Sequence, residues 1–293
     1  MIQRSFIPGD QWLYYKIYSG AKATDTLLTE VVLPLVHQFQ EEGLIEKWFF
    51  IRYADPQHHL RLRFLVSKAG VTEKIMGQVS ERLQPLVSQD IVWKVQLGTY
   101  NRELERYGEQ TMTLSESLFC YDSWATVQFL DLIEGDEGER LRWLFGLRAI
   151  EGLLNAFDYS IQDKLQLMEG LKTGFGREFN MSRPLKKQLD DKYRKEREDI
   201  AHFMTFTAEE EPEYEPLILI LKETYQGIGP IAQDILTIEK NGQLELAKDN
   251  VLGSYIHMLM NRLFKSKNRL NEMVCYDFLF RYYKSKIARS KAQ

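Results

Sequence analysis

Two arginines separated by one leucine are the residues of this chain best suited to chemistry. They lie in the run His59-Leu60-Arg61-Leu62-Arg63-Phe64. Successive side chains of a β-strand point to opposite faces, so Arg61 and Arg63 would share one face with His59. Positions two apart on a strand are ~7 Å from each other, where two guanidinium charges repel by about 2 kcal/mol at an effective dielectric constant of roughly 20. The pair therefore needs an anion, which is either a structural carboxylate from a neighbouring strand or a bound ligand.

A second polar cluster fills the segment from Gly98 to Gly108. If this segment forms a helical turn, Glu103 and Arg106 are three residues apart and share a face. They would then form either a surface ion pair, worth at most about 1 kcal/mol, or a charge pair close to the arginine strand.

A third cluster lies in an apolar helical pattern near residue 257. Ser254, His257 and Asn261 are spaced i, i+3 and i+7, so one helical stripe carries a hydroxyl, an imidazole and an amide. A single helical histidine is commonly structural. Its near-neutral pKa nevertheless makes His257 the best candidate for proton transfer, as acid or base.

Known cofactor and metal motifs are absent from the sequence. His58 and His59 would point in opposite directions in a strand, and there is neither a His-Glu-x-x-His nor a Cys-x-x-Cys motif. Glycine-rich nucleotide-binding loops and the Gly-x-Ser-x-Gly elbow of hydrolases are also missing. We therefore expect no cofactor and no metal.

The composition is that of an ordinary globular protein, with 44% hydrophobic and 27% charged residues and a formal net charge of -4. This charge gives no basic footprint for direct nucleic-acid binding. No stretch of eighteen apolar residues predicts a transmembrane segment, and no apolar signal region is found at the start. Cys120 and Cys275 suit a reducing compartment. We expect a cytoplasmic protein.

The first 108 residues predict an antiparallel sheet covered by helices. Aromatic and β-branched runs predict strands at 11–19, 47–53, 59–66 and 91–97. Helical spacing predicts a helix that follows an N-cap at Asp25 and ends at Gly43, and another over 72–86. This order is the split βαβ pattern.

Residues 109–293 predict a mainly helical part. Helices are expected over 112–133, 139–157, 184–206, 216–238, 247–264 and 268–288. Linkers are expected at 134–138, 170–180 and 208–216, which are rich in glycine, glutamate or proline. The charged helix after Ser182 is expected to be largely solvated. The predicted fold class is α+β, with the split βαβ-like N-terminal part packed against the helical C-terminal part.

These stretches together resemble one known family. The resemblance is carried, in chain order, by Trp12 to Tyr18, Arg52 through Phe64, Tyr100 to Gly108, Phe119 to Ser123 and Ser254 to Leu263. They are similar to the thiopeptide-type bacteriocin biosynthesis domain, the C-terminal glutamate-elimination domain of class I lantibiotic dehydratases. The resemblance spans nearly the whole chain, so it implies a single elimination domain over 1–293, with a sheet part (1–108) and a helical part (109–293).

The resemblance implies that the substrate is a glutamylated precursor peptide made on the ribosome, modified beforehand by a separate glutamyl-tRNA-dependent transferase. The enzyme would be a lyase that expels glutamate from Ser or Thr to leave dehydroalanine or dehydrobutyrine. The chain would then be a stand-alone elimination component of a split system. A homodimer is a further expectation.

The resemblance also places functional residues on the three clusters. Catalytic roles are expected for His257, Arg61, Arg63, Arg106 and Glu103, and substrate binding for Arg52, His59, Tyr100, Ser254 and Asn261. The arginines would bind carboxylate or oxyanion, and Glu103 would receive the ammonium group of the departing glutamate. Two alternatives stay open: a pyridine synthase that joins two dehydroalanines by [4+2] cycloaddition, and a non-catalytic subunit that binds the precursor peptide.

Overall fold

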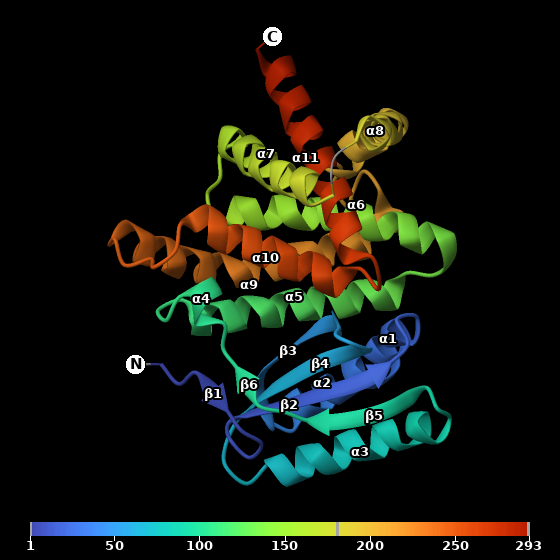
Figure 1. Cartoon of the computed structure of the whole chain (residues 1–293), viewed down its shortest axis with the longest axis vertical. Coiled ribbons are helices and arrows are strands. Elements are labelled where there is room, and N and C mark those ends of the chain that lie inside the picture. The colour runs from blue at the N-terminus through green and yellow to red at the C-terminus, as the bar shows by residue number, and fades with distance from the viewer. Residues whose placement is uncertain (1, 180–181, 292–293) are drawn as a thin grey trace. The chain divides into compact units, whose positions relative to one another are not determined.

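The computed structural model describes residues 2–179 and 182–291, and the chain divides into two compact units (Figure 1). The first unit lies within 1–132, 237–247 and 261–266, and the second within 133–236, 248–260 and 267–293. Helices together with antiparallel sheets confirm the predicted α+β class. The unit that bears the sheets continues past residue 108, and the assignment of a single elimination domain stays a prediction.

A four-stranded antiparallel sheet forms the first unit. Its strands are β2 (Trp12–Ser19), β3 (Ile45–Ala54), β4 (His58–Val66) and β5 (Val92–Leu97), in the spatial order β3-β4-β2-β5. A helical connection joins β2 to β3, a tight turn joins β3 to β4, and helix α3 (Thr72–Ser88) joins β4 to β5. This is the split βαβ arrangement expected from the sequence. It places the arginine strand β4 in the interior of the sheet.

The helical connection after β2 has three consecutive parts. These are α1 (Ala23–Thr26), a π-helical turn (Leu27–Val32) and α2 (Leu33–Glu41). The predicted N-cap at Asp25 is wrong, because the helix already begins at Ala23. The Asp25 carboxylate instead pairs with Arg52 at 2.6 Å. Pro34 follows the wide turn, and because proline has no backbone N–H it removes one regular helical hydrogen bond there.

The apolar face of the sheet is the one predicted from the alternation in β4. Leu60, Leu62 and Phe64 are at most 1% exposed, and the ring of Phe64 meets that of Phe39 on α2 edge-on, at 5.4 Å. Helix α3 runs next to β5, and its buried residues repeat at helical spacing (Figure 1). Burial of this face leaves the opposite face for the polar side chains.

Side chains close the outer edge of β3. Helix α5 (Met112–Leu132) runs along this strand, and Ser123 accepts a hydrogen bond from the backbone N–H of Phe50 at 3.2 Å. The carbonyl of Phe50 accepts one from Arg262 at 2.9 Å. The amide of Asn261 bonds both the N–H and the C=O of Arg52, each at 2.9 Å. At the other edge of the sheet, the residues of β5 from Trp93 to Leu97 are all exposed.

A smaller sheet pairs β1 (Ser5–Phe6) with β6 (Tyr100–Asn101) and was not predicted. It is followed by the short helix α4 (Leu104–Tyr107). Arg102 forms a buried, two-pronged ion pair with Glu116 of α5, at 2.7 and 2.6 Å. This pair fixes the end of the small sheet to the helix that closes β3.

The second unit consists of helices. They are α6 (Gly135–Ala156), α7 (Ile161–Glu178), α8 (Arg183–Phe203), a 3-10 turn (Pro212–Tyr214), most of α9 (Glu215–Lys240), most of α10 (Lys248–Leu263) and α11 (Asn268–Ser290). Two predicted linkers are wrong: α6 already begins at Gly135, and α7 continues to Glu178. Residue 180, the last of the second linker, lies outside the described residues. The linker at 208–216 is confirmed up to the start of the 3-10 turn.

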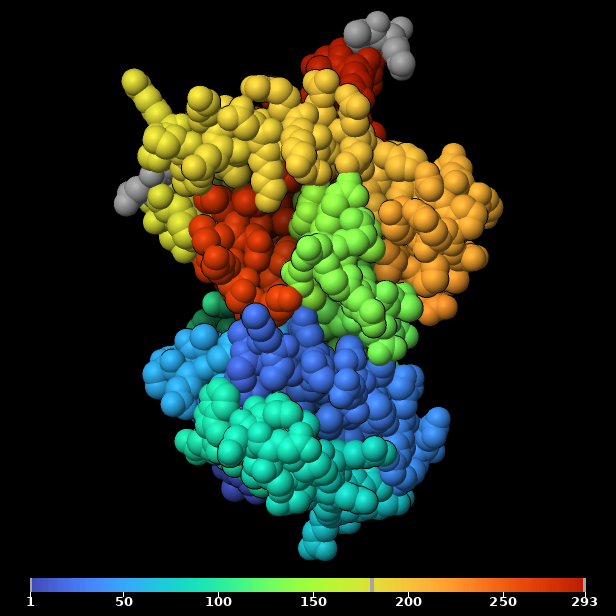
Figure 2. Space-filling model, turned by 90° about the vertical axis from the view of Figure 1, so that its right-hand side faces the viewer, coloured from blue at the N-terminus to red at the C-terminus, as the bar shows by residue number. Residues whose placement is uncertain are grey.

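Helix α7 was missed because three glycines fall near its end, yet its start has a clear signal. Ser160 and Asp163 form a complete capping box. The helix packs along α11, so tertiary contacts outweigh the cost of its glycines. Helix α8 follows the outside of this unit, as expected for its charged sequence (Figure 2). None of the helices within 2–179 and 182–291 is both long and apolar enough to cross a membrane.

Gly152 on α6 has no space for a side chain. A Cβ there would lie 2.3 Å from the ring of Tyr225, whose hydroxyl is held by the carbonyl of Ala149 at 2.5 Å. We expect Gly152→Ala to lower the free energy of unfolding by about 1–3 kcal/mol, because overpacking outweighs the better helix propensity of alanine. Gly174→Ala on α7 meets nothing within 4 Å and should be neutral or stabilising. Urea unfolding of both variants measures this, and an unchanged midpoint for Gly152→Ala would contradict it.

Candidate functional site

One face of the four-stranded sheet gathers four cationic side chains, and we call it the cationic face. Residues paired across antiparallel strands point to the same side, so the register builds rows across the sheet. One row runs Gln96, Lys16, Arg61, Ile51, and the next runs Lys94, Tyr18, His59, Tyr53. Arg63 lies in a third row, between Tyr14 and Phe49. Among the described residues, no carboxylate forms an ion pair with any of these four cations.

Arg63 lies in a cage of aromatic rings. Its guanidinium carbon is 4.6, 5.0 and 4.9 Å from the ring centroids of Tyr14, Phe49 and Tyr100. The residue is 7% exposed, and its Nε and Nη1 are buried without a hydrogen-bond partner among the described residues. Burial lowers the pKa of Arg63, although a guanidinium stays charged at neutral pH. A buried charge without a balancing partner is costly, and an anion would offset that cost.

Arg61 is held in place by two aromatic neighbours. Its guanidinium stacks 3.4 Å from the ring centroid of Tyr53, and its Nε donates to Nε2 of His59 at 3.2 Å. His59 in turn bonds the carbonyl of Gln57 through Nδ1 at 2.8 Å and stacks on Tyr18. A carbonyl only accepts, so Nδ1 carries the proton and Nε2 accepts. The neutral His59 thus orients Arg61, and among the described residues nothing hydrogen-bonds the two terminal nitrogens of Arg61.

This geometry predicts a low pKa for His59. Burial lowers the pKa, and the charges of Arg61 and Lys16 lower it further, against the hydrogen bond to Gln57, which raises it. We expect the imidazole to titrate below its ordinary value of 6.5 in an NMR pH titration, and Arg61→Ala to raise that pKa. The stability contributed by neutral His59 is full above the unfolded pKa and is lost as the pH falls through the folded one. A pKa above 6.5 in the wild type would contradict this.

Tyr100 is the third ring of the cage around Arg63, and Glu116 fixes its position. Its hydroxyl donates to Glu116 at 2.8 Å, within the ion pair between Glu116 and Arg102. Burial raises the pKa of Tyr100 well above its ordinary value, and the adjacent Glu116 raises it further. Tyr100 is therefore uncharged: its ring packs against the guanidinium of Arg63, and its hydroxyl donates to Glu116.

Glu103 and Arg106 form the predicted ion pair, at 3.2 Å, on an exposed turn. The separation fits the i, i+3 spacing, and the exposure fits the surface-pair interpretation, which gives at most about 1 kcal/mol. Glu103 nevertheless acts on Arg63, because its charge raises the pKa of that guanidinium. The pair thus lies within electrostatic range of the cationic face.

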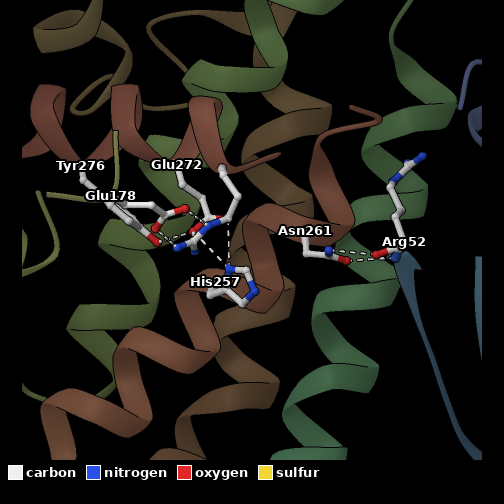
Figure 3. A network of polar contacts seen from close by, with 7 residues as sticks. Arg52, Glu178, His257, Asn261, Glu272 and Tyr276 are labelled. Atoms are coloured by element: carbon white, nitrogen blue, oxygen red, sulfur yellow. Dashed lines mark hydrogen bonds and ion pairs between the residues drawn. The ribbon is translucent and has the colours of Figure 1, made fainter. Parts of the chain in front are cut away.

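Arg52 and Asn261 are bonded to each other, and both have structural hydrogen-bond partners. The amide of Asn261 bonds the backbone of Arg52 (Figure 3). The Arg52 guanidinium donates to the carbonyl of Arg262 at 2.8 Å and to Asp25. Both side chains of this pair support the β3 edge. Their expected role in substrate binding stays a prediction.

The second unit holds His257 in a polar cluster between α10 and α11. Nδ1 of His257 lies 2.9 Å from the carboxylate of Glu272, and the two side chains point toward one another (Figure 3). Glu272 is fully buried and is also bonded by Arg269 and Tyr276, each at 3.3 Å. Arg269 is anchored in turn by Glu178. A carboxylate that accepts from Nδ1 fixes the tautomer of the imidazole.

Nε2 is therefore the basic nitrogen of His257. The side chain is 30% exposed, and among the described residues nothing hydrogen-bonds Nε2. The arrangement suits a proton acceptor that is oriented by a carboxylate. Ser254 lies one turn earlier on α10, and its hydroxyl bonds back to the carbonyl of Asn250 at 3.0 Å.

Several residues of these clusters were missed from the sequence. Lys16 and Lys94 had only a partial signal: each lies in a predicted strand, but its place on the face of the arginines depends on the register of the sheet. Glu272 had none. It lies fifteen residues beyond His257 on another helix, and the pairing depends on how α10 and α11 pack.

Comparisons with known proteins identify the family of this chain. Residues 12–283 match the family described as lantibiotic biosynthesis dehydratase C-term. The chain therefore belongs to this family. Its curated relatives include the subtilin biosynthesis protein SpaB of Bacillus subtilis, 26% identical over 182 residues, and the nisin biosynthesis protein NisB of Lactococcus lactis subsp. lactis, 32% identical over 133 residues. These matches cover 61% and 45% of this chain but only 18% and 13% of the relatives' lengths.

Solved structures share the fold. The tRNA dependent lantibiotic dehydratase MibB from Microbispora sp. 107891 matches with a TM-score of 0.74 at 19% identity, over 99% of this chain and 29% of MibB. TsrL matches with a TM-score of 0.66 at 15% identity, covering 97% of this chain and 96% of TsrL. The pyridine synthase TbtD from thiomuracin biosynthesis matches with 0.64 at 13% identity, covering 92% and 97%. At these identities the likeness concerns the fold alone.

Proposed function

We propose that this chain is a lyase that eliminates glutamate from glutamylated Ser or Thr residues of a ribosomally made precursor peptide. The observation that carries the proposal is the cationic face, where Arg61 and Arg63 lie together and no carboxylate of residues 2–179 and 182–291 forms an ion pair with them. A substrate that brings its own carboxylate would supply the missing charge. Membership of the dehydratase family, and the tRNA dependence named for MibB, support this choice of substrate.

The reaction removes the Cα proton of the modified residue. Nε2 of His257 accepts this proton, the electron pair of the C–H bond forms the Cα=Cβ double bond, and the Cβ–O bond breaks. The ester oxygen leaves as part of the α-carboxylate of glutamate. Positive charge near the peptide carbonyl and near the leaving carboxylate stabilises the negative charge that develops during these steps.

The cationic face and the His257 cluster have separate tasks in this scheme. Arg61 and Arg63 bind the carboxylates of the departing glutamate, with Arg106 in support, and Glu103 receives its ammonium group. Glu272 keeps the His257 ring in the tautomer that accepts a proton. A separate glutamyl-tRNA-dependent transferase would prepare the substrate.

Mass spectrometry tests the proposal directly. The purified chain is incubated with glutamylated precursor peptide, and elimination should remove the glutamate and leave each modified residue one water lighter than in the unmodified peptide. Arg61→Ala should let the glutamylated peptide accumulate. A pyridine synthase or a peptide-binding subunit would leave the mass of the glutamylated peptide unchanged, and that result would refute the lyase.

A further inference from the structure

Lys16 is a cation of the cationic face to which the proposed function gives no role. It lies on β2 directly opposite Arg61 on β4, in the same row of the sheet. Like charges that face each other across antiparallel strands destabilise the pairing, because their side chains leave the sheet on one side. Lys16 and Arg61 are such a pair, in an interior position of the sheet.

Nothing within the described residues neutralises Lys16. Its side chain is half-buried, and its Nζ lies 5.8 Å from the centroid of the Tyr14 ring. No carboxylate within residues 2–179 and 182–291 forms an ion pair with it. Its charge also lowers the pKa of His59, the neighbour of Arg61 on the same face. The like charges of Lys16 and Arg61 are thus an unfavourable pair in the folded protein.

From this arrangement we propose that Lys16 is a substrate-binding residue that holds one carboxylate of the glutamyl group together with Arg61, while Arg63 serves the other carboxylate. The proposal rests on the proposed function and deepens it. Glutamate transferred from tRNA is esterified through its α-carboxyl, so its side-chain carboxylate is charged throughout. The α-carboxylate gains its charge only as the Cβ–O bond breaks. Departing glutamate therefore has two carboxylates, and Lys16 adds a further cation to the arginines that bind them.

The two cations of the row are complementary. Arg61 is fixed by Tyr53 and His59 and presents a planar fork. Lys16 is a compact charge on a flexible stem, and it can follow a carboxylate that shifts as the bond to the peptide breaks. Gly98 lies beside this stem: a Cβ there would lie 3.2 Å from the ring of Tyr14 and 3.6 Å from Cε of Lys16.

Binding of the product L-glutamate to the full chain tests Lys16 without relying on turnover. We expect Lys16→Gln to raise the dissociation constant for L-glutamate by about tenfold or more, because one charge-assisted contact is lost. Lys16→Arg keeps the charge and should retain most of the affinity. Lys68→Gln makes the same change of net charge at an exposed position and should bind L-glutamate like the wild type. Thermal unfolding verifies that the variants are folded.

The outcomes separate the two proposals. If the wild type neither binds L-glutamate nor removes it from the glutamylated peptide, the proposed function fails. If the wild type does both and Lys16→Gln matches it in affinity and in elimination rate, the role of Lys16 is refuted and the lyase stands. An equal loss in Lys68→Gln would also refute it, because the effect would then come from net charge alone.

Discussion

Replacing Arg63 with methionine should remove most of the elimination activity and leave the protein at least as stable as the wild type. Methionine fills a similar volume inside the cage of Tyr14, Phe49 and Tyr100 but has no charge. Loss of one donor that stabilises developing negative charge costs about 10²-fold or more in rate. Replacement of a buried, unbalanced ion by an apolar side chain is often neutral or stabilising.

The combination of the two measurements decides between the alternatives for Arg63. Rates of glutamate loss come from mass spectrometry, and the free energy of unfolding comes from urea titration. A structural arginine would show the reverse pattern, with lower stability and a nearly normal rate in Arg63→Met. Arg63→Lys keeps the charge without the planar fork, and we expect its rate to lie between those of the methionine variant and the wild type.

Replacing His257 with alanine should stop elimination at the glutamylated peptide. A general base contributes about 10²–10⁴-fold to a rate, so a loss of this size is expected. His257 is 30% exposed and lies above a buried carboxylate, so its removal should change stability far less than it changes activity. Normal dehydration by His257→Ala would overturn the assigned proton transfer.

Chemical rescue separates proton transfer from a structural role. Imidazole added to His257→Ala should restore part of the rate, because a small base can enter the space that the side chain has left. No rescue is expected for Arg61→Ala under the same conditions. Glu272→Gln should lower kcat with little change in KM, because Glu272 orients the ring and does not bind the substrate. An unchanged kcat in this variant would show that Glu272 does not orient the base.

The fold was largely predictable where the sequence pattern is strong. The alternation of Leu60, Leu62 and Phe64 identified the buried face of β4, and the four main strands agree with their predictions to within two residues. Errors occurred where local signals compete. Glycines suggested a linker across α7, although its packing along α11 makes it a helix.

The site was predictable only in part, for a physical reason. The spacing of Arg61 and Arg63 shows that they share a strand face, and that of Glu103 and Arg106 shows their ion pair. Whether a carboxylate balances the two arginines depends on which strands lie beside β4, and the sequence does not show that. The structural use of Asn261 at the β3 edge likewise depends on a contact with Arg52, more than two hundred residues away.

The closed edge of β3 limits how copies of this chain can associate. Ser123, Asn261 and Arg262 already occupy the outward backbone groups of Phe50 and Arg52, so a strand pairing there would have to displace all three side chains together. Growth of a continuous intermolecular sheet needs two free edges in each molecule, and this four-stranded sheet offers one, at β5. Edge-to-edge pairing through this sheet therefore ends at two molecules, and it cannot produce a fibre.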